Sequence, residues 1–272
     1  MKHIQEIDEL IRLLWRSERF HCLIIESPPG WGKSSVVSKL LSDLEVPFEI
    51  LGSYTTPLGL YNAFQKAPQK VHLMDDCAGI FQDQAAVSIL KAATWESSGT
   101  GNKRFVKWNT SSGLVQKEGF SFTGKVILLT NYLPSGAEIR SLLSRSLHLS
   151  FGFKMEEIRR MLMEASQNEL YFPDREAARV AANYLCANLH RFNEREVNLR
   201  TLHIAYELVR SSPERWVELL GRLVPRNQTG IIVNKLRYSG KSVKEQIEEF
   251  TRSTGKSRRT FFYYRKSAPD RA

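Results

Sequence analysis

The chain has 272 residues, enough for one large or two modest domains, and the composition of an ordinary globular protein. No apolar stretch approaches the ~20 residues that span a bilayer, so we expect no membrane partner. The three cysteines are widely spaced and fit neither a disulfide framework nor a zinc site, which favours a reducing, cytoplasmic location.

The net charge of +10 is concentrated at the end of the chain. Residues 222–272 carry 13 Lys and Arg against 4 Asp and Glu, whereas the preceding residues are close to neutral. A basic tail on a near-neutral body indicates binding to nucleic acid or another polyanion.

A glycine-containing loop follows the first predicted strand. A helix is predicted near residues 4–14, and the apolar run 23–25 predicts a buried strand that breaks at Ser27. The chain then passes through Gly32-Lys33-Ser34 into a helical pattern, which is the order of a P-loop. In such a loop, backbone N–H groups face phosphates, the lysine reaches the terminal phosphates and the hydroxyl ligates Mg²⁺. The alternative is an ordinary turn between a strand and a helix.

The predicted phosphate-binding residues are those of the loop and the first turn of its helix: Ser27, Pro28, Pro29, Gly30, Trp31, Gly32, Lys33, Ser34 and Ser35. Ser27 stands where a P-loop has its first glycine, and serine lacks the free choice of φ that glycine has.

Further short apolar segments predict the strands 47–51, 71–76, 125–131 and 146–151. They alternate with predicted helices, a pattern that favours a parallel α/β sheet with ligands at the carboxyl ends of its strands. From 154 to 223 no strand pattern occurs. Three helical segments, near 155–165, 175–189 and 199–220, predict a separate helical subdomain there.

Polar residues end two of the predicted strands. Asp75 and Asp76 fit a carboxylate pair in which Asp75 supports Mg²⁺ and Asp76 orients or deprotonates the attacking water. Asn131 ends the strand 125–131, where its amide is suited to position that water. The alternatives are a strand-end cap for the aspartates and a turn residue for Asn131.

The order and spacing of these motifs resemble the AAA+ ATPase family. The likeness rests on Pro28 to Ser34, on Leu73-Met74-Asp75-Asp76, on Leu129-Thr130-Asn131 and on Leu142-Leu143-Ser144-Arg145, and it covers about residues 4–222. The resemblance implies a P-loop α/β core (1–153), a helical lid (154–222), bound ATP and Mg²⁺, and a ring or spiral homo-oligomer, often a hexamer. Asp76 departs from the glutamate usual in the family.

The resemblance also implies two arginine contacts with the nucleotide. Arg145 would reach the γ-phosphate of a neighbouring subunit, with Arg140 as the competing candidate, and Arg200 would contact the nucleotide from the lid. Arg145 is favoured over Arg140, and the alternative for both is an ordinary surface charge.

A β-hairpin is predicted between the second aspartate and Asn131. Residues 103–108 alternate basic and apolar side chains, and 119–122 are suited to pair with them. Its place is similar to that of the hairpin with which superfamily 3 helicases grip DNA. The candidate DNA contacts are Lys103, Arg104, Lys107 and Trp108, through phosphate pairing and base stacking. The alternative is a solvated hairpin whose aromatic rings pack on the core.

The tail, 223–272, resembles a helix-turn-helix. Its second helix, 258–266, would enter a major groove or lie along phosphates. The candidate contacts are Lys256, Arg258, Arg259, Tyr263, Arg265 and Lys266. The alternative is a basic, solvated helix that serves assembly.

Together these features predict an ATP-hydrolysing protein that acts on DNA, of the helicase or helicase-loader kind found in phages and mobile elements. A replication or transposition protein is a possible partner. Two alternatives stay open: a DNA-bound ATP switch that recruits a transposase or helicase, and a DNA-binding regulator with little hydrolysis.

Overall fold

The computed structural model describes residues 2–52, 55–76, 78–95, 104–108, 119–192, 196–224 and 227–267. The chain forms two compact units, Met1–Gly152 and Phe153–Ala272. Among the described residues, no helix has both the length and the apolar character needed to cross a membrane.

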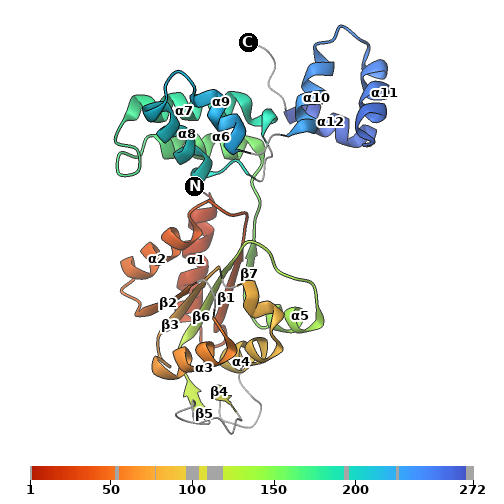
Figure 1. Cartoon of the computed structure of the whole chain (residues 1–272). Coiled ribbons are helices and arrows are strands. Elements are labelled where there is room, and N and C mark those ends of the chain that lie inside the picture. The colour runs from red at the N-terminus through yellow and green to blue at the C-terminus, as the bar shows by residue number, and fades with distance from the viewer. Residues whose placement is uncertain are drawn as a thin grey trace. The chain divides into compact units, whose positions relative to one another are not determined.

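The first unit is a parallel sheet covered by helices (Figure 1). Its elements are α1 (Lys2–Arg16), β1 (Cys22–Glu26), α2 (Lys33–Asp43), β2 (Phe48–Gly52), α3 (Pro57–Lys66), β3 (Val71–Asp75), the 3-10 helix η1 (Ala78–Gln82), α4 (Gln84–Thr94), β4 (Arg104–Lys107), β5 (Gly119–Phe122), β6 (Lys125–Thr130), α5 (Ala137–Leu143) and β7 (Leu147–Ser150). The five-stranded sheet has the order β2-β3-β6-β1-β7, and every pairing is parallel. The predicted α/β fold class is confirmed.

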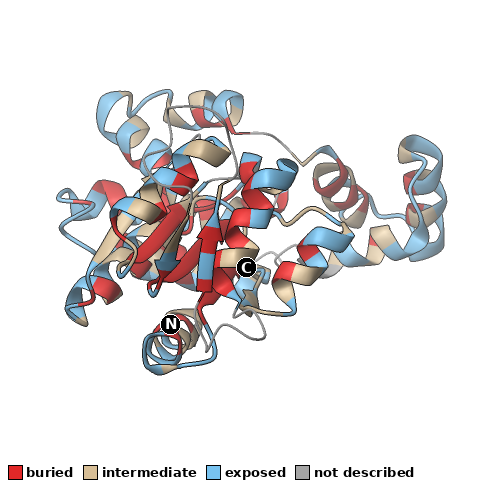
Figure 2. Cartoon of the chain, turned by 90° about the horizontal axis from the view of Figure 1, so that it is seen from below, coloured by how far each residue is buried: buried red, intermediate tan, exposed pale blue. Residues whose placement is uncertain are grey.

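The central strands β1, β3 and β6 are buried on both faces, whereas the edge strands β2 and β7 are partly exposed. Figure 2 shows the buried residues gathered in the middle of the sheet. Successive side chains of a strand point to opposite faces. Leu23 and Ile25 of β1 therefore pack with Val37 of α2 on the face that α1 also covers. Ile24 packs on the other face, against Leu60 of α3 and helices α4 and α5. Burial on both faces explains why the strands read as continuous apolar runs.

The predicted hairpin is present. β4 and β5 form an antiparallel pair in which Arg104 lies opposite Phe122 and Lys107 opposite Gly119. Val106 and Phe122 are buried in the core beside α4, whereas Phe105 is 43% exposed. The hairpin is therefore attached to the sheet's helical layer by one of its faces.

The second unit is helical. It contains α6 (Met155–Ser166), α7 (Arg175–Asn188), the 3-10 helix η2 (Leu189–Arg191), α8 (Leu199–Ser211), α9 (Trp216–Leu223), α10 (Gln228–Arg237), α11 (Val243–Thr254) and α12 (Arg258–Ser267). The single helical segment predicted for 199–220 is two helices, because Pro213 has no N–H to continue α8. The boundary predicted at 222/223 falls inside this unit, so the three-domain division stays a prediction.

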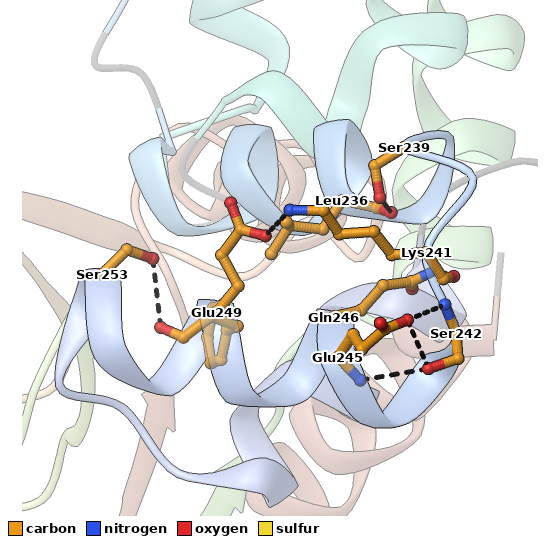
Figure 3. Close-up of polar contacts among 9 residues, drawn as sticks. Leu236, Ser239, Lys241, Ser242, Glu245, Gln246, Glu249 and Ser253 are labelled. Carbon is orange, nitrogen blue, oxygen red and sulfur yellow. Dashed lines mark hydrogen bonds and ion pairs between the residues drawn. The ribbon is translucent and has the colours of Figure 1, made fainter.

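The last three helices share a small core of Val233, Leu236, Phe250 and Phe261. Figure 3 shows the turn that joins α10 to α11. The Ser242 hydroxyl caps α11 by accepting the N–H of Glu245, and the Glu245 carboxylate accepts the N–H of Ser242 at 2.7 Å. The Gln246 amide donates to the carbonyl of Lys241 at 2.7 Å. These bonds fix the start of α11.

The helix α10 packs closely on η2. The N–H of Asn227 donates to the Arg191 carbonyl at 2.8 Å, and a Cβ at Gly230 would collide with the His190 carbonyl oxygen. Only glycine permits this approach, so the three C-terminal helices are attached to the preceding ones through a main-chain contact.

Lys125, the first residue of β6, joins the sheet to the segment after α1. Its ammonium donates to the carbonyl of Phe20 at 2.9 Å and to that of Ser17. Burial lowers the pKa of Lys125 to about 8, and the charge of Arg104 contributes to this lowering. Folding therefore favours loss of this proton.

We predict a pH-dependent contribution of Lys125 to stability. Between about pH 8 and its ordinary value of 10.5, the unfolded chain binds a proton on Lys125 that the folded chain lacks, so stability rises with pH in this window. The free energy of unfolding, measured in urea, should therefore rise more steeply with pH for the wild-type chain than for Lys125→Met between about pH 7.5 and 9.5. A difference that stays constant with pH would contradict this assignment.

Candidate functional site

The loop between β1 and α2 has the backbone of a tight turn. Gly30 and Gly32 have φ values of 79° and 74°, in the left-handed region that glycine adopts without strain. Ser27 is 2% exposed, and its N–H donates to the carbonyl of Thr130 at 3.1 Å. Among the described non-glycine residues, positive φ occurs at Glu45 and Asp76, so serine at position 27 has no left-handed strain to bear.

The first turn of α2 is suited to an anion. Its N-cap residue is Gly32, no side chain caps the helix, and no acidic residue lies in its first turn. By contrast, side chains of Asp174, Asn198 and Ser242 cap α7, α8 and α11. The backbone N–H groups at the start of α2 and the helix dipole together favour a phosphate at this point.

Three predicted site residues are joined by hydrogen bonds. The Lys33 ammonium donates to the Asn131 side-chain oxygen at 2.9 Å, and the Asn131 amide donates to a carboxylate oxygen of Asp76 at 3.2 Å. Lys33 also donates to the carbonyls of Ser27 and Pro28, at 2.8 and 3.0 Å. Residues from the start of α2 and the ends of β3 and β6 thus meet at the carboxyl edge of the sheet.

Asp76 has an unusual backbone. Its φ of 58° lies in the left-handed region, which aspartate tolerates better than most residues but which still costs about 1 kcal/mol. The conformation follows directly after Asp75, the last residue of β3. Asp76 is thereby held in the turn, with its carboxylate bonded to Asn131.

The residues predicted to hold Mg²⁺ have suitable chemistry. Ser34 lies in the first turn of α2 and Asp75 ends β3, and hydroxyl and carboxylate oxygens are ligands that this hard cation prefers. Mg²⁺ binds proteins through one or two carboxylates and substrate phosphates rather than through an all-protein cage. No cluster of three His, Cys, Asp or Glu suited to a metal occurs among the described residues.

Of the two predicted arginine contacts, Arg145 lies in the first unit, just after α5. Its guanidinium carbon lies over the ring of Trp95, 5.0 Å from the centroid. Arg200 is exposed in the first turn of α8, in the second unit, where the Asn198 side chain caps the helix. The partner ring of Arg145 was not predicted, because Trp95 at the end of a helix carries no motif.

The hairpin residues divide into buried and exposed ones. Arg104 is 6% exposed, and its guanidinium donates to the carbonyls of Ala93 and Gly124, both at 2.8 Å. The prediction that Arg104 contacts DNA is wrong, because a buried arginine bonded to main-chain carbonyls is part of the core. Trp108 is half-buried against Tyr61. Lys103 lies outside the described residues.

The exposed side of the hairpin presents Lys107 and Phe105, whose ring the Lys107 ammonium approaches to 5.8 Å. A Cβ at Gly119 would lie 2.5 Å from the Phe105 ring, so the ring rests directly on the glycine backbone. Phe105 was missed as a candidate, since alternation along 103–108 does not say which face is exposed.

The tail residues also divide into two groups. Arg265 donates to the side chain of the buried Gln246 at 2.6 Å, and Lys256 donates to the hydroxyl of Thr229 at 2.8 Å. These two cations tie α12 and its preceding turn to α11 and α10.

The other described side chains of the tail prediction are exposed. Arg258 and Arg259 begin α12, and Tyr263, one turn after Arg259, is 53% exposed. The side chain of Lys266 lies outside the described residues. The exposed surface of α12 is therefore basic and aromatic.

Comparisons with known proteins bear on the fold. No family model matches the chain, and no curated protein matches its sequence. Among solved structures, a point mutant of RuvB from Thermotoga maritima aligns with a TM-score of 0.50 and 12% identity, over 93% of this chain and 82% of that one. The T. maritima structure described as the RuvB Holliday junction branch migration motor aligns with a TM-score of 0.49 and 11% identity, over 97% and 87%.

The first of these likenesses shows the fold alone: the chain shares the α/β fold of that RuvB structure. At 12% identity it transfers no residue role or activity to this chain.

The loop geometry yields a matched pair of variants. Gly32→Ala should weaken ATP binding about tenfold, because its φ of 74° costs an L-residue about 1–2 kcal/mol although a Cβ would meet no atom within 4 Å. Ser27→Gly should leave affinity within about twofold, since the serine has no such strain. Calorimetric titration with ATP measures both. Equal losses in the two variants would contradict this account of the loop.

Proposed function

We propose that this chain is an ATP-hydrolysing AAA+ protein that acts on DNA. The observation that carries the proposal is the hydrogen-bonded series Lys33–Asn131–Asp76 at the carboxyl edge of a parallel sheet, beside an uncapped helix N-terminus. A cation, a neutral amide and a carboxylate are the groups that phosphoryl transfer to water requires.

Each group has a distinct task in hydrolysis. The N–H groups of the loop and Lys33 hold the phosphates and stabilise the charge that develops on them. Asn131 exchanges its bond to Lys33 for one to the γ-phosphate or the attacking water, which Asp76 orients and deprotonates. Ser34 and Asp75 would hold Mg²⁺, which neutralises phosphate charge when bound.

The proposed assembly is a ring or spiral of identical chains. Arg145 would enter the nucleotide site of a neighbouring copy, and Arg200 would contact the nucleotide from the lid. An arginine that arrives in the transition state contributes charge where it is needed and links hydrolysis to subunit contact.

The proposed DNA contacts lie on both units. On the hairpin, Lys107 would meet phosphates and Phe105 would stack on bases. Trp108 offers less stacking surface, because it packs against Tyr61. In the tail, α11 and α12 would form a helix-turn-helix, with Arg258 and Arg259 at the start of the recognition helix.

The helicase or helicase-loader role in a phage or mobile element is the finer form of this proposal. It rests on the direct linkage of a proposed motor to a basic tail, a replication or transposition protein being the partner. A second candidate is a DNA-bound ATP switch with slow turnover. The short side chain of Asp76 and its bond to Asn131 favour it, because they hold the carboxylate back from a water at the γ-phosphate.

We expect DNA to stimulate ATP hydrolysis by the wild-type chain. Lys33→Ala should abolish turnover by loss of phosphate binding, and Asp76→Asn should lower kcat at least about a hundredfold while ATP still binds, because the amide cannot accept a proton. Steady-state hydrolysis with single- and double-stranded DNA measures both. ATP binding without turnover in wild type would favour the switch.

The exposed arginines at the start of α12 predict how DNA binding responds to substitution. Arg258→Ala combined with Arg259→Ala should weaken duplex binding about tenfold or more and reduce the slope of log K against log salt by about 2, one per lost phosphate contact. The matched control combines Arg160→Ala with Arg179→Ala, exposed arginines of α6 and α7 that pair with Glu164 and Glu176. Equal losses in the two double variants would show that net charge alone governs binding.

A further inference from the structure

The contact between Arg145 and Trp95 joins residues that lie 50 positions apart in the chain. Trp95 follows the end of α4, is 48% exposed, and lies under the guanidinium of Arg145. Three exposed arginines elsewhere pair with carboxylates of their own helix: Arg12 with Asp8, Arg179 with Glu176 and Arg222 with Glu218. The exposed Arg210 and Arg258 lie over rings of their own helices, those of Tyr206 and Phe262. In the described part of the chain, no carboxylate pairs with Arg145.

A carboxylate and an aromatic ring have different effects on the charge and the N–H donors of a guanidinium. A carboxylate neutralises the guanidinium and occupies its N–H donors. An aromatic face restricts the side chain while the charge and the in-plane donors stay available. Arg140, the competing arginine, is exposed on α5 and has no such ring beneath it among the described residues. Of the two, Arg145 alone is both oriented and available.

We propose that Trp95 is a positioning residue that holds Arg145 ready to enter the nucleotide site of a second copy of this chain. This rests on the proposed function. The indole limits the rotamers of a long, flexible side chain before the copies meet, so less conformational freedom is lost when the guanidinium reaches the phosphate. The nucleotide site is then complete only in the assembly, and its rate depends on a ring from the neighbouring copy.

Mixed assemblies test this directly. Donor chains carry Lys33→Ala, so they hold no phosphate of their own but present Arg145. Acceptor chains carry Arg145→Ala, so they bind ATP but lack the arginine. Each is inactive alone, and their mixture should hydrolyse ATP.

Adding Trp95→Leu to the donor should reduce the kcat of the mixture about fivefold without changing KM, whereas the same change in the acceptor should have no effect. Trp95→Phe in the donor should retain most activity, because it keeps an aromatic face.

A second variant guards against misfolding of Trp95→Leu. Arg145→Lys in the donor keeps the charge but loses the flat group that stacks, so it should reduce activity and then be insensitive to the leucine substitution. The assembly mass and the circular dichroism spectrum of each donor variant should match those of the donor that carries Lys33→Ala alone.

The outcomes separate this inference from the proposed function. Equal activity with and without Trp95→Leu in the donor, or an equal loss when the acceptor carries it, overturns the role of Trp95 and leaves ATP hydrolysis standing. An active wild type whose two inactive variants never complement each other overturns the entry of Arg145 into a second copy. An inactive wild type contradicts the proposed function and this inference together.

Discussion

The hydrogen bonds among Lys33, Asn131 and Asp76 depend on the register of adjacent parallel strands. β1 and β6 end level, with Glu26 opposite Thr130, and β3 pairs with the other edge of β6. A slip of one residue would turn each following side chain to the opposite face of the sheet. The helices on both faces hold this register, because the central strands β1, β3 and β6 contribute alternate residues to two separate cores. The candidate site is thus a consequence of the packing beneath it.

The sequence predicted the elements that have strong local signals. Apolar runs located the five parallel strands, and glycines with a following Lys-Ser located the loop before α2. What it did not reveal depends on contacts between distant residues. The sequence places Arg104 among the basic residues of the hairpin, yet it is buried and donates to the carbonyls of Ala93 and Gly124. Trp95 and Arg145 are far apart in the chain, and only the fold brings them together.

The basic residues of this protein serve two purposes that composition cannot separate. Lys125, Arg104 and Arg265 donate to carbonyl or amide oxygens of the protein and hold elements together. Arg258 and Arg259 are exposed at the start of a helix and are available to a polyanion. The net charge of the tail therefore overstates the number of its possible phosphate contacts, and an interface has to be argued from exposure rather than from charge.

We propose that nucleotide binds where Lys33, Asn131 and Asp76 meet. An experimental structure of the protein with Mg²⁺ and a non-hydrolysable ATP analogue would test this proposal. We expect phosphates on the N–H groups of the loop before α2, with Lys33 and Asn131 both turned to the γ-phosphate and away from each other. Nucleotide bound elsewhere, or a Lys33–Asn131 bond that persists beside bound phosphates, would contradict it.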